Sequence, residues 1–222
     1  MTNIRGLDEE QAWDYENGFH WFSSPSRLNK MLAHYELYKM IKDLPGDIVE
    51  LGVYKSASLI RFATFRNTFE NDAARRIVGF DAFGAFPTDG LSLPEDLEFV
   101  EEFEEEAGDG LSREEIEKIL EIKGFSNIEL VKGNVLDTLP RHLSRYPHTR
   151  IALLHLDMDV KEPTAFALER LFERVVRGGL IVVDDYNAVA GATDAIDEFA
   201  ARHDLRLHKM PHYNVPAYIV KQ

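Results

Sequence analysis

The sequence predicts an α/β protein built around a mostly parallel sheet. Short apolar runs that end in acidic residues or glycine alternate with helical patterns, and this alternation is typical of repeated β-α-β units. Continuous apolar strands indicate a parallel sheet that is covered on both faces. The last two strand patterns are separated by residues 211–215 alone. That stretch is too short for a crossover helix, so these two strands should form an antiparallel hairpin.

Seven strands are expected, at residues 47–52, 77–81, 128–132, 151–157, 180–184, 205–210 and 216–220. The helical patterns before and between them cover residues 26–42, 56–67, 112–123, 135–145, 162–177 and 192–203. Ser26 is a candidate cap for the first helix, and the loop at Pro45-Gly46 follows it. Gly178-Gly179 should end the fifth helix, because glycine is frequent just past a helix C-terminus.

Composition narrows the class of protein. The chain has 222 residues, with 25 Lys and Arg against 39 Asp and Glu, a formal net charge of −14. This balance argues against a nucleic-acid partner and against an anionic membrane surface. The absence of cysteine excludes disulfides, thiolate nucleophiles and cysteine-zinc sites. No signal-peptide core and no membrane-length apolar run is present, so we expect a cytoplasmic protein with one main domain.

Residues 83–110 differ in character from the rest of the chain. They contain Pro87, Pro94, several glycines and the acidic run 101–106. We expect a mobile insert that carries a short amphipathic helix and lies over the ligand crevice. The acidic run itself is expected to face solvent.

Four aspartates follow two of the apolar runs. Asp157 and Asp159 end Leu153-Leu-His-Leu-Asp-Met-Asp159, and Asp184 and Asp185 end the run that starts at Gly178. Open α/β sheets bind ligands at the carboxyl ends of their strands, so these acids should share one crevice. Like charges raise one another's pKa unless a cation compensates, and an oxygen-only set suits Mg²⁺. The competing interpretation of the adjacent pair is one helix cap and one solvated acid.

Other strand ends suggest a nucleotide-like ligand. A strand ends in Glu50-Leu51-Gly52, where Gly52 permits close approach of a ligand, and the helix that begins near Ser56 offers free N–H groups. Asp81 is placed to accept both hydroxyls of a ribose. Gly133-Asn134 could pack beside a purine ring. Taken singly, these segments could also be ordinary strand-to-helix turns. His155 lies inside an apolar strand and is expected to be a satisfied core histidine.

Five segments in order carry a family resemblance: Val49-Glu-Leu-Gly-Val-Tyr-Lys55, Val78-Gly-Phe-Asp-Ala-Phe83, Leu154-His-Leu-Asp-Met-Asp-Val-Lys-Glu-Pro-Thr164, Gly178-Gly-Leu-Ile-Val-Val-Asp-Asp-Tyr186 and Gly191-Ala-Thr-Asp-Ala-Ile-Asp-Glu-Phe199. Over roughly residues 25–200, the chain resembles the macrocin O-methyltransferase (TylF-like) family. These are class I enzymes that use S-adenosylmethionine and Mg²⁺ to methylate sugar hydroxyls in antibiotic biosynthesis. The resemblance implies a Rossmann-like seven-stranded methyltransferase sheet with a C-terminal antiparallel hairpin and a helical lid. It also implies an N-terminal helical cap at residues 1–45 and a methyltransferase domain at residues 46–222, with the lid insert at 83–110.

The resemblance also assigns roles to residues. Asp157, Asp184 and Asp185 match the family's metal carboxylates, and Asp159 matches an acid proposed as the general base. The residues expected to bind the cofactor are Glu50, Gly52, Ser58, Asp81, Asn134 and Val135. Two positions depart from the family pattern: Ser56 and Met158 stand where glycine is frequent. Ser56 should tighten the cofactor loop, and Met158 should narrow the acceptor pocket.

The function expected from the sequence is Mg²⁺-dependent methylation of a hydroxyl on a small sugar-containing acceptor, either a nucleotide-linked deoxysugar or a glycosylated natural product. Relatives often self-associate, so a homo-oligomer is expected. One alternative is a phosphatase of the haloacid-dehalogenase type, because Asp157-Met-Asp159 followed by Thr164 resembles its motif. Three strands precede that motif here, whereas in the phosphatases it ends the first strand. The other alternative is a non-catalytic S-adenosylmethionine-binding protein.

Overall fold

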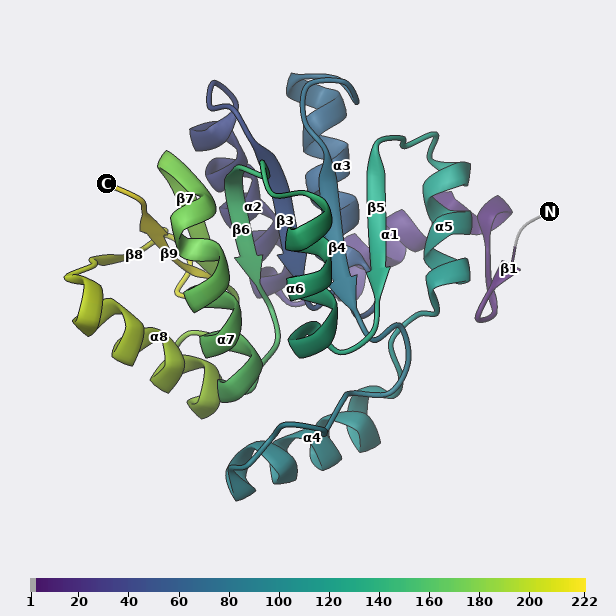
Figure 1. Ribbon diagram of the computed structural model, residues 1–222. Helices are drawn as coiled ribbons and strands as arrows, with labels where there is room; N and C mark the ends of the chain where they lie inside the picture. Colours follow the sequence, from purple (N-terminus) through teal and green to yellow (C-terminus); the bar gives the residue numbers. More distant parts are fainter. Residues whose placement is uncertain (1–2) are drawn as a thin grey trace.

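The central feature of the fold is one seven-stranded sheet with the order β5-β4-β3-β6-β7-β9-β8. It is seen in a computed structural model that describes residues 3–222 (Figure 1). The first five strands in this order pair in parallel, whereas β9 pairs antiparallel with both β7 and β8. The strands are β3 (Asp47–Leu51), β4 (Ile77–Asp81), β5 (Ile128–Lys132), β6 (Ile151–Leu156), β7 (Val175–Val183), β8 (Leu207–Lys209) and β9 (Ala217–Val220). The predicted parallel sheet with its C-terminal hairpin is therefore confirmed.

Helices cover both faces of the sheet (Figure 1). One face carries α2 (Pro25–Ile41), α3 (Ala57–Phe69) and α5 (Arg113–Ile122), and the other carries α6 (Val135–Arg145), α7 (Lys161–Leu171) and α8 (Ala190–His203). Successive strand residues point to opposite faces, so Ile48 joins the core cluster beneath α2 and α3 while Val49 joins the one beneath α6 and α7. The strands are thus apolar on both sides, which accounts for their uninterrupted apolar runs.

The N-terminal segment contains elements that the sequence patterns did not indicate. A two-stranded ribbon of β1 (Asn3–Ile4) and β2 (Leu7–Asp8) leads through a short 3₁₀ turn, η1 (Glu9–Gln11), into α1 (Ala12–Phe22). No residue of α1 is buried, so no apolar stripe marked it in the sequence. The next helix begins at Pro25, and Ser24 caps it by accepting from the Ser26 N–H at 3.3 Å. The cap predicted at Ser26 was therefore wrong by two residues, because proline occupies the first helical position.

Gly178-Gly179 is not the helix end that the sequence predicted. Helix α7 stops at Leu171, a 3₁₀ turn η2 (Phe172–Arg174) follows, and β7 already begins at Val175. Ile151 pairs with Val175 but Leu153 pairs with Leu180, so the two glycines form a bulge inside the strand. Gly178 has φ +81°, and a Cβ on Gly179 would lie 2.9 Å from the Val176 carbonyl oxygen. Glycine is required here by the bulge, which a sequence pattern cannot distinguish from a helix end.

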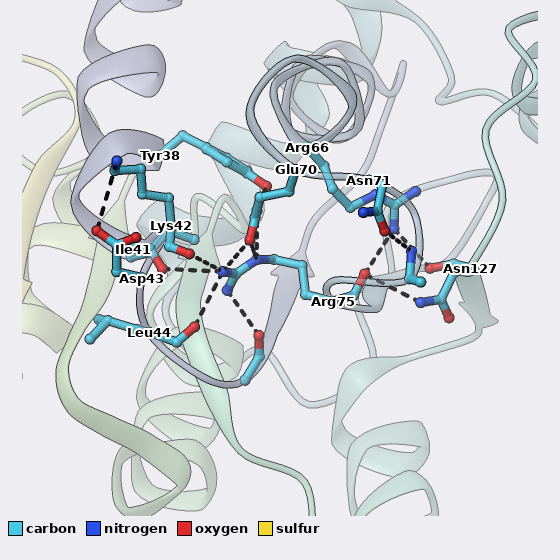
Figure 2. A network of polar contacts seen from close by, with 12 residues as sticks. Tyr38, Ile41, Lys42, Asp43, Leu44, Arg66, Glu70, Asn71, Arg75 and Asn127 are labelled. Atoms are coloured by element: carbon cyan, nitrogen blue, oxygen red, sulfur yellow. Dashed lines mark hydrogen bonds and ion pairs between the residues drawn. The ribbon is translucent and has the colours of Figure 1, made fainter.

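A buried arginine fixes the C-terminal end of α2. Figure 2 shows Arg75, which is 5% exposed, directed at the carbonyl groups of Ile41, Lys42 and Leu44, each 3.2 Å from its Nη2. Ile41 is the last residue of α2 and the other two carbonyls follow it, so Arg75 donates to the chain where the helix ends. The same guanidinium donates to Glu70 at 2.8 Å. Helix α2 is thereby held against the end of α3, which sets the position of the residues that α2 directs toward the sheet.

The insert between β4 and α5 carries the expected helix, α4 (Pro94–Ala107), which projects beyond the ends of the central strands (Figure 1). Most of the acidic run is exposed, as expected, but Glu104 is partly buried and accepts from the Phe86 N–H at 2.6 Å. Mobility of the insert and the division into cap and methyltransferase domain stay predictions. Within residues 3–222, no helix combines the length and apolar character needed to span a bilayer.

Candidate active site

A cavity of about 730 Å³ opens at the carboxyl ends of the parallel strands. Its volume lies within the roughly 300–1,000 Å³ typical of small-molecule sites. The residues that line it come from the loops after β3, β4, β5, β6 and β7, from the insert, and from helices that include α1, α2 and α3. They include most of the predicted site residues, namely Gly52, Ser58, Asp81, Asn134, Val135, Asp157, Asp159, Asp184 and Asp185.

The acids of the cavity lie together as the strand pattern predicted. Strands β6 and β7 are parallel neighbours with Leu156 opposite Val183, so the residues that follow them meet at one edge. Ligand oxygens of Asp157, Asp184 and Asp185 lie within 4.8 Å of one another. The Asp159 N–H donates to Asp185 Oδ2 at 3.2 Å, which ties the two strand ends to each other.

Burial and mutual repulsion shape the protonation of this cluster. Burial raises the pKa of Asp157 and of Asp185 well above the ordinary carboxyl value, and neighbouring aspartates raise it further. Burial, with a smaller contribution from the neighbouring aspartates, raises the pKa of Asp159 to about 7. In the absence of a cation, these acids therefore tend to hold protons, and a bound cation would replace them.

Asp184 differs from its neighbours because positive groups surround it. Lys30 from α2 forms an ion pair with its Oδ2, and His155 Nε2 lies 3.4 Å from its Oδ1. Burial opposes ionisation of Asp184, but the hydrogen bond from His155 and the charge of Lys30 outweigh it and hold the pKa well below the ordinary value. His34 Nε2 lies 3.5 Å from Oδ1, but burial lowers the pKa of His34 to about 4. Asp184 thus stays ionised next to two aspartates that do not.

His155 joins Asp184 to Glu50 inside the sheet. Its Nδ1 lies 3.0 Å from Glu50 Oε1, and both side chains are fully buried. Burial opposes the charged form of His155, but the hydrogen bonds to Asp184 and Glu50 raise its pKa to about 10. Glu50 does not line the cavity and reaches it through His155 and Asp184. His155 is the satisfied core histidine that the sequence indicated, and the assignment of Glu50 to the cofactor stays a prediction.

The donor set of the acid cluster fits a hard divalent cation. Three carboxylates converge, and an all-oxygen set is what Mg²⁺ prefers. Two other groups of possible ligands include His155, but both nitrogens of that ring already face carboxylates. The three aspartates also open onto the cavity, where a ligand could complete the coordination.

The loop after β3 comes unusually close to the loop after β6. Gly52 has φ +89°, and a Cβ there would lie 1.7 Å from the Asp157 carbonyl oxygen, so no other residue fits without moving the backbone. Asp81 holds the same loop from the other side. Its Oδ2 accepts from the Val53 and Tyr54 N–H groups at 2.7 and 2.9 Å, and its Oδ1 accepts from the Phe83 N–H at 2.6 Å. Asp81 therefore orders two loops of the cavity as well as lining it.

Two positions near these loops bear on the cofactor hypothesis. Ser56, where the family usually has glycine, adopts the left-handed conformation with φ +59°, so this chain keeps a glycine-type turn without glycine. Ser58 in the first turn of α3 lines the cavity. At the end of β5, Asn134 caps α6 by accepting from the Leu136 N–H at 3.0 Å, and it donates to the Asp89 carbonyl at 3.0 Å. Asn134 thus joins the insert to the sheet.

The insert is also attached to the loop after β3. Tyr54 Oη donates to the carbonyls of Ala107 and Gly108 at 2.8 and 3.0 Å, and Lys55 Nζ donates to the Ala107 carbonyl at 2.6 Å. The Tyr54 ring lies 5.2 Å from that of Phe103 in α4, measured between centroids. These contacts form the α4 latch, which joins the C-terminal end of α4 to the backbone beside Gly52.

Several cavity residues were missed by the sequence analysis. Arg27, Lys30 and Arg61 line the cavity, and His34 lies beneath it against Asp184. A signal for two of them was present: Lys30 and His34 are four residues apart and continue the buried stripe of α2 that includes Leu37. Polar residues on the inward face of an amphipathic helix are candidates for a buried site.

The sheet order, the antiparallel last strand pair and the acidic strand ends define a class I methyltransferase fold. Among solved structures, the calicheamicin methyltransferase CalS11 is 26% identical with a TM-score of 0.75, and the match covers 96% of this chain and 86% of that one. The O-methyltransferase NovP has a TM-score of 0.72 at 23% identity, covering 85% and 79% of the two chains. The model of the macrocin-O-methyltransferase (TylF) family matches residues 20–214, and the chain belongs to this family.

Two O-methyltransferases are among the curated relatives, and the match covers only part of the length of each. The 8-demethyl-8-(2,3-dimethoxy-alpha-L-rhamnosyl)-tetracenomycin-C 4'-O-methyltransferase from Streptomyces olivaceus is 29% identical over 164 residues, which are 73% of this chain and 60% of the relative. The mycinamicin III 3''-O-methyltransferase from Micromonospora griseorubida is 26% identical over 218 residues, covering 92% and 83% of the two chains. The chain thus spans less than two thirds of the first of these relatives.

Proposed function

We propose that this protein transfers a methyl group from S-adenosylmethionine to a hydroxyl of a small sugar-containing acceptor, with Mg²⁺ held by Asp157, Asp184 and Asp185. The observation that carries this proposal is that one cavity is lined both by the three carboxylates and by Asp81 and Asn134. Family membership and the sugar-modifying O-methyltransferases among the relatives support the same reaction.

The cofactor would lie along the loops that Asp81 orders. Asp81 and Asn134 would receive the adenosine part, and the loop at Gly52, which also lines the cavity, would lie beside the chain that leads to the sulfonium. S-Adenosylmethionine supplies a methyl group that already bears a good leaving group, so the protein needs to align two partners and remove one proton.

Asp159 is suited to remove that proton. It lines the cavity beside the metal carboxylates, where its side chain could accept a proton from an acceptor hydroxyl. Mg²⁺, when bound, would lower the pKa of the acceptor hydroxyl. Lys30 would have to leave Asp184 as the cation enters, because both use the same carboxylate. Met158 lies buried in the cavity wall between the two acids and limits the space at the acceptor end.

The experiment that tests the proposal is a methyl-transfer assay with thymidine diphosphate rhamnose, the sugar nucleotide named for CalS11, and with a neutral rhamnoside. Formation of S-adenosylhomocysteine should require acceptor, should stop in chelator and should return with Mg²⁺. Asp159→Asn should lower the rate by roughly 10²–10⁴, the usual worth of a positioned base, while Mg²⁺ affinity by calorimetry stays close to wild type.

Three outcomes would contradict parts of the proposal. Full activity in chelator would remove the metal, and a collapse of Mg²⁺ affinity in Asp159→Asn would make Asp159 a ligand. Cofactor binding without turnover on either acceptor would favour the non-catalytic alternative. The phosphatase alternative is not favoured, because the chain belongs to an O-methyltransferase family. Release of phosphate from p-nitrophenyl phosphate would be evidence for it. A homo-oligomer, a cytoplasmic location and the lack of a nucleic-acid partner stay predictions.

A further inference from the structure

Two arginines of the cavity wall have no acidic partner. Arg27 on α2 is exposed and Arg61 on α3 is partly buried, and both line the cavity. Across residues 3–222, neither side chain has a hydrogen-bond or ion-pair partner. The other two cations of the wall are engaged, since Lys30 pairs with Asp184 and Lys55 donates to the Ala107 carbonyl at 2.6 Å.

The position of Arg61 is unfavourable for its charge. Arg61 is partly buried; burial lowers its pKa, and the nearby charge of Arg27 lowers it further. Asp184, Glu50 and Asp157 attract Arg61 only from beyond ion-pair distance. Two of these acids already have partners, since Asp184 pairs with Lys30 and Glu50 with His155. A partly desolvated cation without a partner is unfavourable until an anion approaches it.

The chemistry of the pair indicates which anion would fit. Guanidinium groups present planar forks that bind carboxylate and phosphate oxygens with two hydrogen bonds each. Both guanidinium groups face the same cavity, in a chain whose formal net charge is −14. They also lie on the α2–α3 side, next to the metal carboxylates and away from the β4 and β5 ends, where Asp81 and Asn134 lie.

We infer that Arg27 and Arg61 form an anion subsite that binds a carboxylate or phosphate group of a molecule bound in the cavity. The inference rests on the proposed function, which brings two such groups into reach. One is the amino-acid carboxylate of the cofactor, and the other is the diphosphate of a nucleotide-linked sugar. A diphosphate at this subsite would make the acceptor a sugar nucleotide and exclude a neutral glycoside.

The test compares three ligands by calorimetry with the 222-residue protein. S-Adenosylhomocysteine carries the carboxylate, 5'-methylthioadenosine lacks it, and thymidine diphosphate carries only the diphosphate. The variants are Arg27→Gln and Arg61→Gln, with Arg61→Lys to keep the charge without the fork. Arg113→Gln is the matched control, because Arg113 is exposed on α5 and pairs with Glu117 of the same helix. Circular dichroism and thermal unfolding verify that each variant is folded.

Loss of a charge-assisted hydrogen bond should weaken the affected ligand roughly tenfold to a hundredfold. Weaker binding of S-adenosylhomocysteine with unchanged binding of 5'-methylthioadenosine would assign the subsite to the cofactor carboxylate. Weaker binding of thymidine diphosphate with unchanged S-adenosylhomocysteine would assign it to the acceptor. Either result supports the subsite. Folded variants that bind all three ligands within twofold of wild type would overturn it, without affecting the proposed reaction. A wild-type protein that binds no adenosine ligand would instead overturn the proposed function.

Discussion

Replacement of His155 by leucine should destabilise the protein more than any ordinary loss of a side-chain hydrogen bond. His155 lies between Glu50 on β3 and Asp184 after β7, and all three side chains are at most 2% exposed. Among the described residues, His155 is the hydrogen-bond partner of Glu50, whose Oε2 already has none. Leucine would therefore leave a fully buried carboxylate with both oxygens unpaired.

The expected loss is about 3–5 kcal/mol in the free energy of unfolding, the usual result of removing one partner from a buried ion pair. Urea unfolding at pH 7 in chelator measures it without interference from metal. The double variant Glu50→Leu/His155→Leu should recover part of the loss, because it removes the stranded carboxylate as well. A loss below about 1 kcal/mol, or a double variant less stable than the single one, would refute this reasoning.

The same pair predicts a dependence on pH. The pKa of His155 in the folded protein is raised to about 10 from an ordinary 6.5. Its contribution to stability is therefore fully present below pH 6.5 and is lost as the pH rises through about 10. The stability difference between wild type and His155→Leu should shrink over that range. A difference that stays constant from pH 7 to 10 would contradict a charged His155 in the folded state.

Three further predictions concern neighbouring residues. Burial lowers the pKa of His34 to about 4, so the stability that His34 contributes is present above about pH 6.5 and is lost as the pH falls toward 4. Thermal unfolding should therefore show that His34→Gln loses less stability than the wild type over this pH range. An unchanged dependence of stability on pH would contradict the prediction. Ser56→Gly should raise the free energy of unfolding in urea by roughly 0.5–1 kcal/mol, because relief of the left-handed strain exceeds the added entropy of the unfolded chain; a less stable variant would show that the serine side chain contributes more than the strain costs. Lys30→Met should tighten Mg²⁺ binding in calorimetry roughly tenfold, since no ion pair with Asp184 has to break, and unchanged or weaker binding would mean that Lys30 does not compete with the metal.

The sheet could be predicted from the sequence because each central strand is apolar on both faces and ends at an acid or a glycine. The grouping of Asp157, Asp184 and Asp185 followed from the same pattern, since parallel neighbours end at one edge. The bulge at Gly178-Gly179 could not be predicted, because glycine serves helix ends and strand bulges alike and only the pairing with β6 distinguishes them.

The positively charged residues of the cavity could not be located from the sequence. Lys30 and Arg61 reach the cavity because α2 and α3 pack side by side on one face of the sheet, and packing of helices over a sheet is not encoded in the strand pattern. The sequence also did not indicate that Asp81 orders two loops in addition to lining the cavity. A strand-end acid was expected at a ribose, but its hydrogen bonds to three backbone N–H groups depend on how two loops fold around it.

The α4 latch has a consequence for the order of events in the cavity. Tyr54 and Lys55 connect the end of α4 to the same short loop that Asp81 and Gly52 position. An acceptor large enough to push α4 outward would have to break these hydrogen bonds or carry the loop with it. The free energy of binding one substrate would then depend on whether the other is already bound. By thermodynamic reciprocity the dependence is mutual. Each substrate would then change the affinity of the protein for the other through the hydrogen bonds of Tyr54 and Lys55.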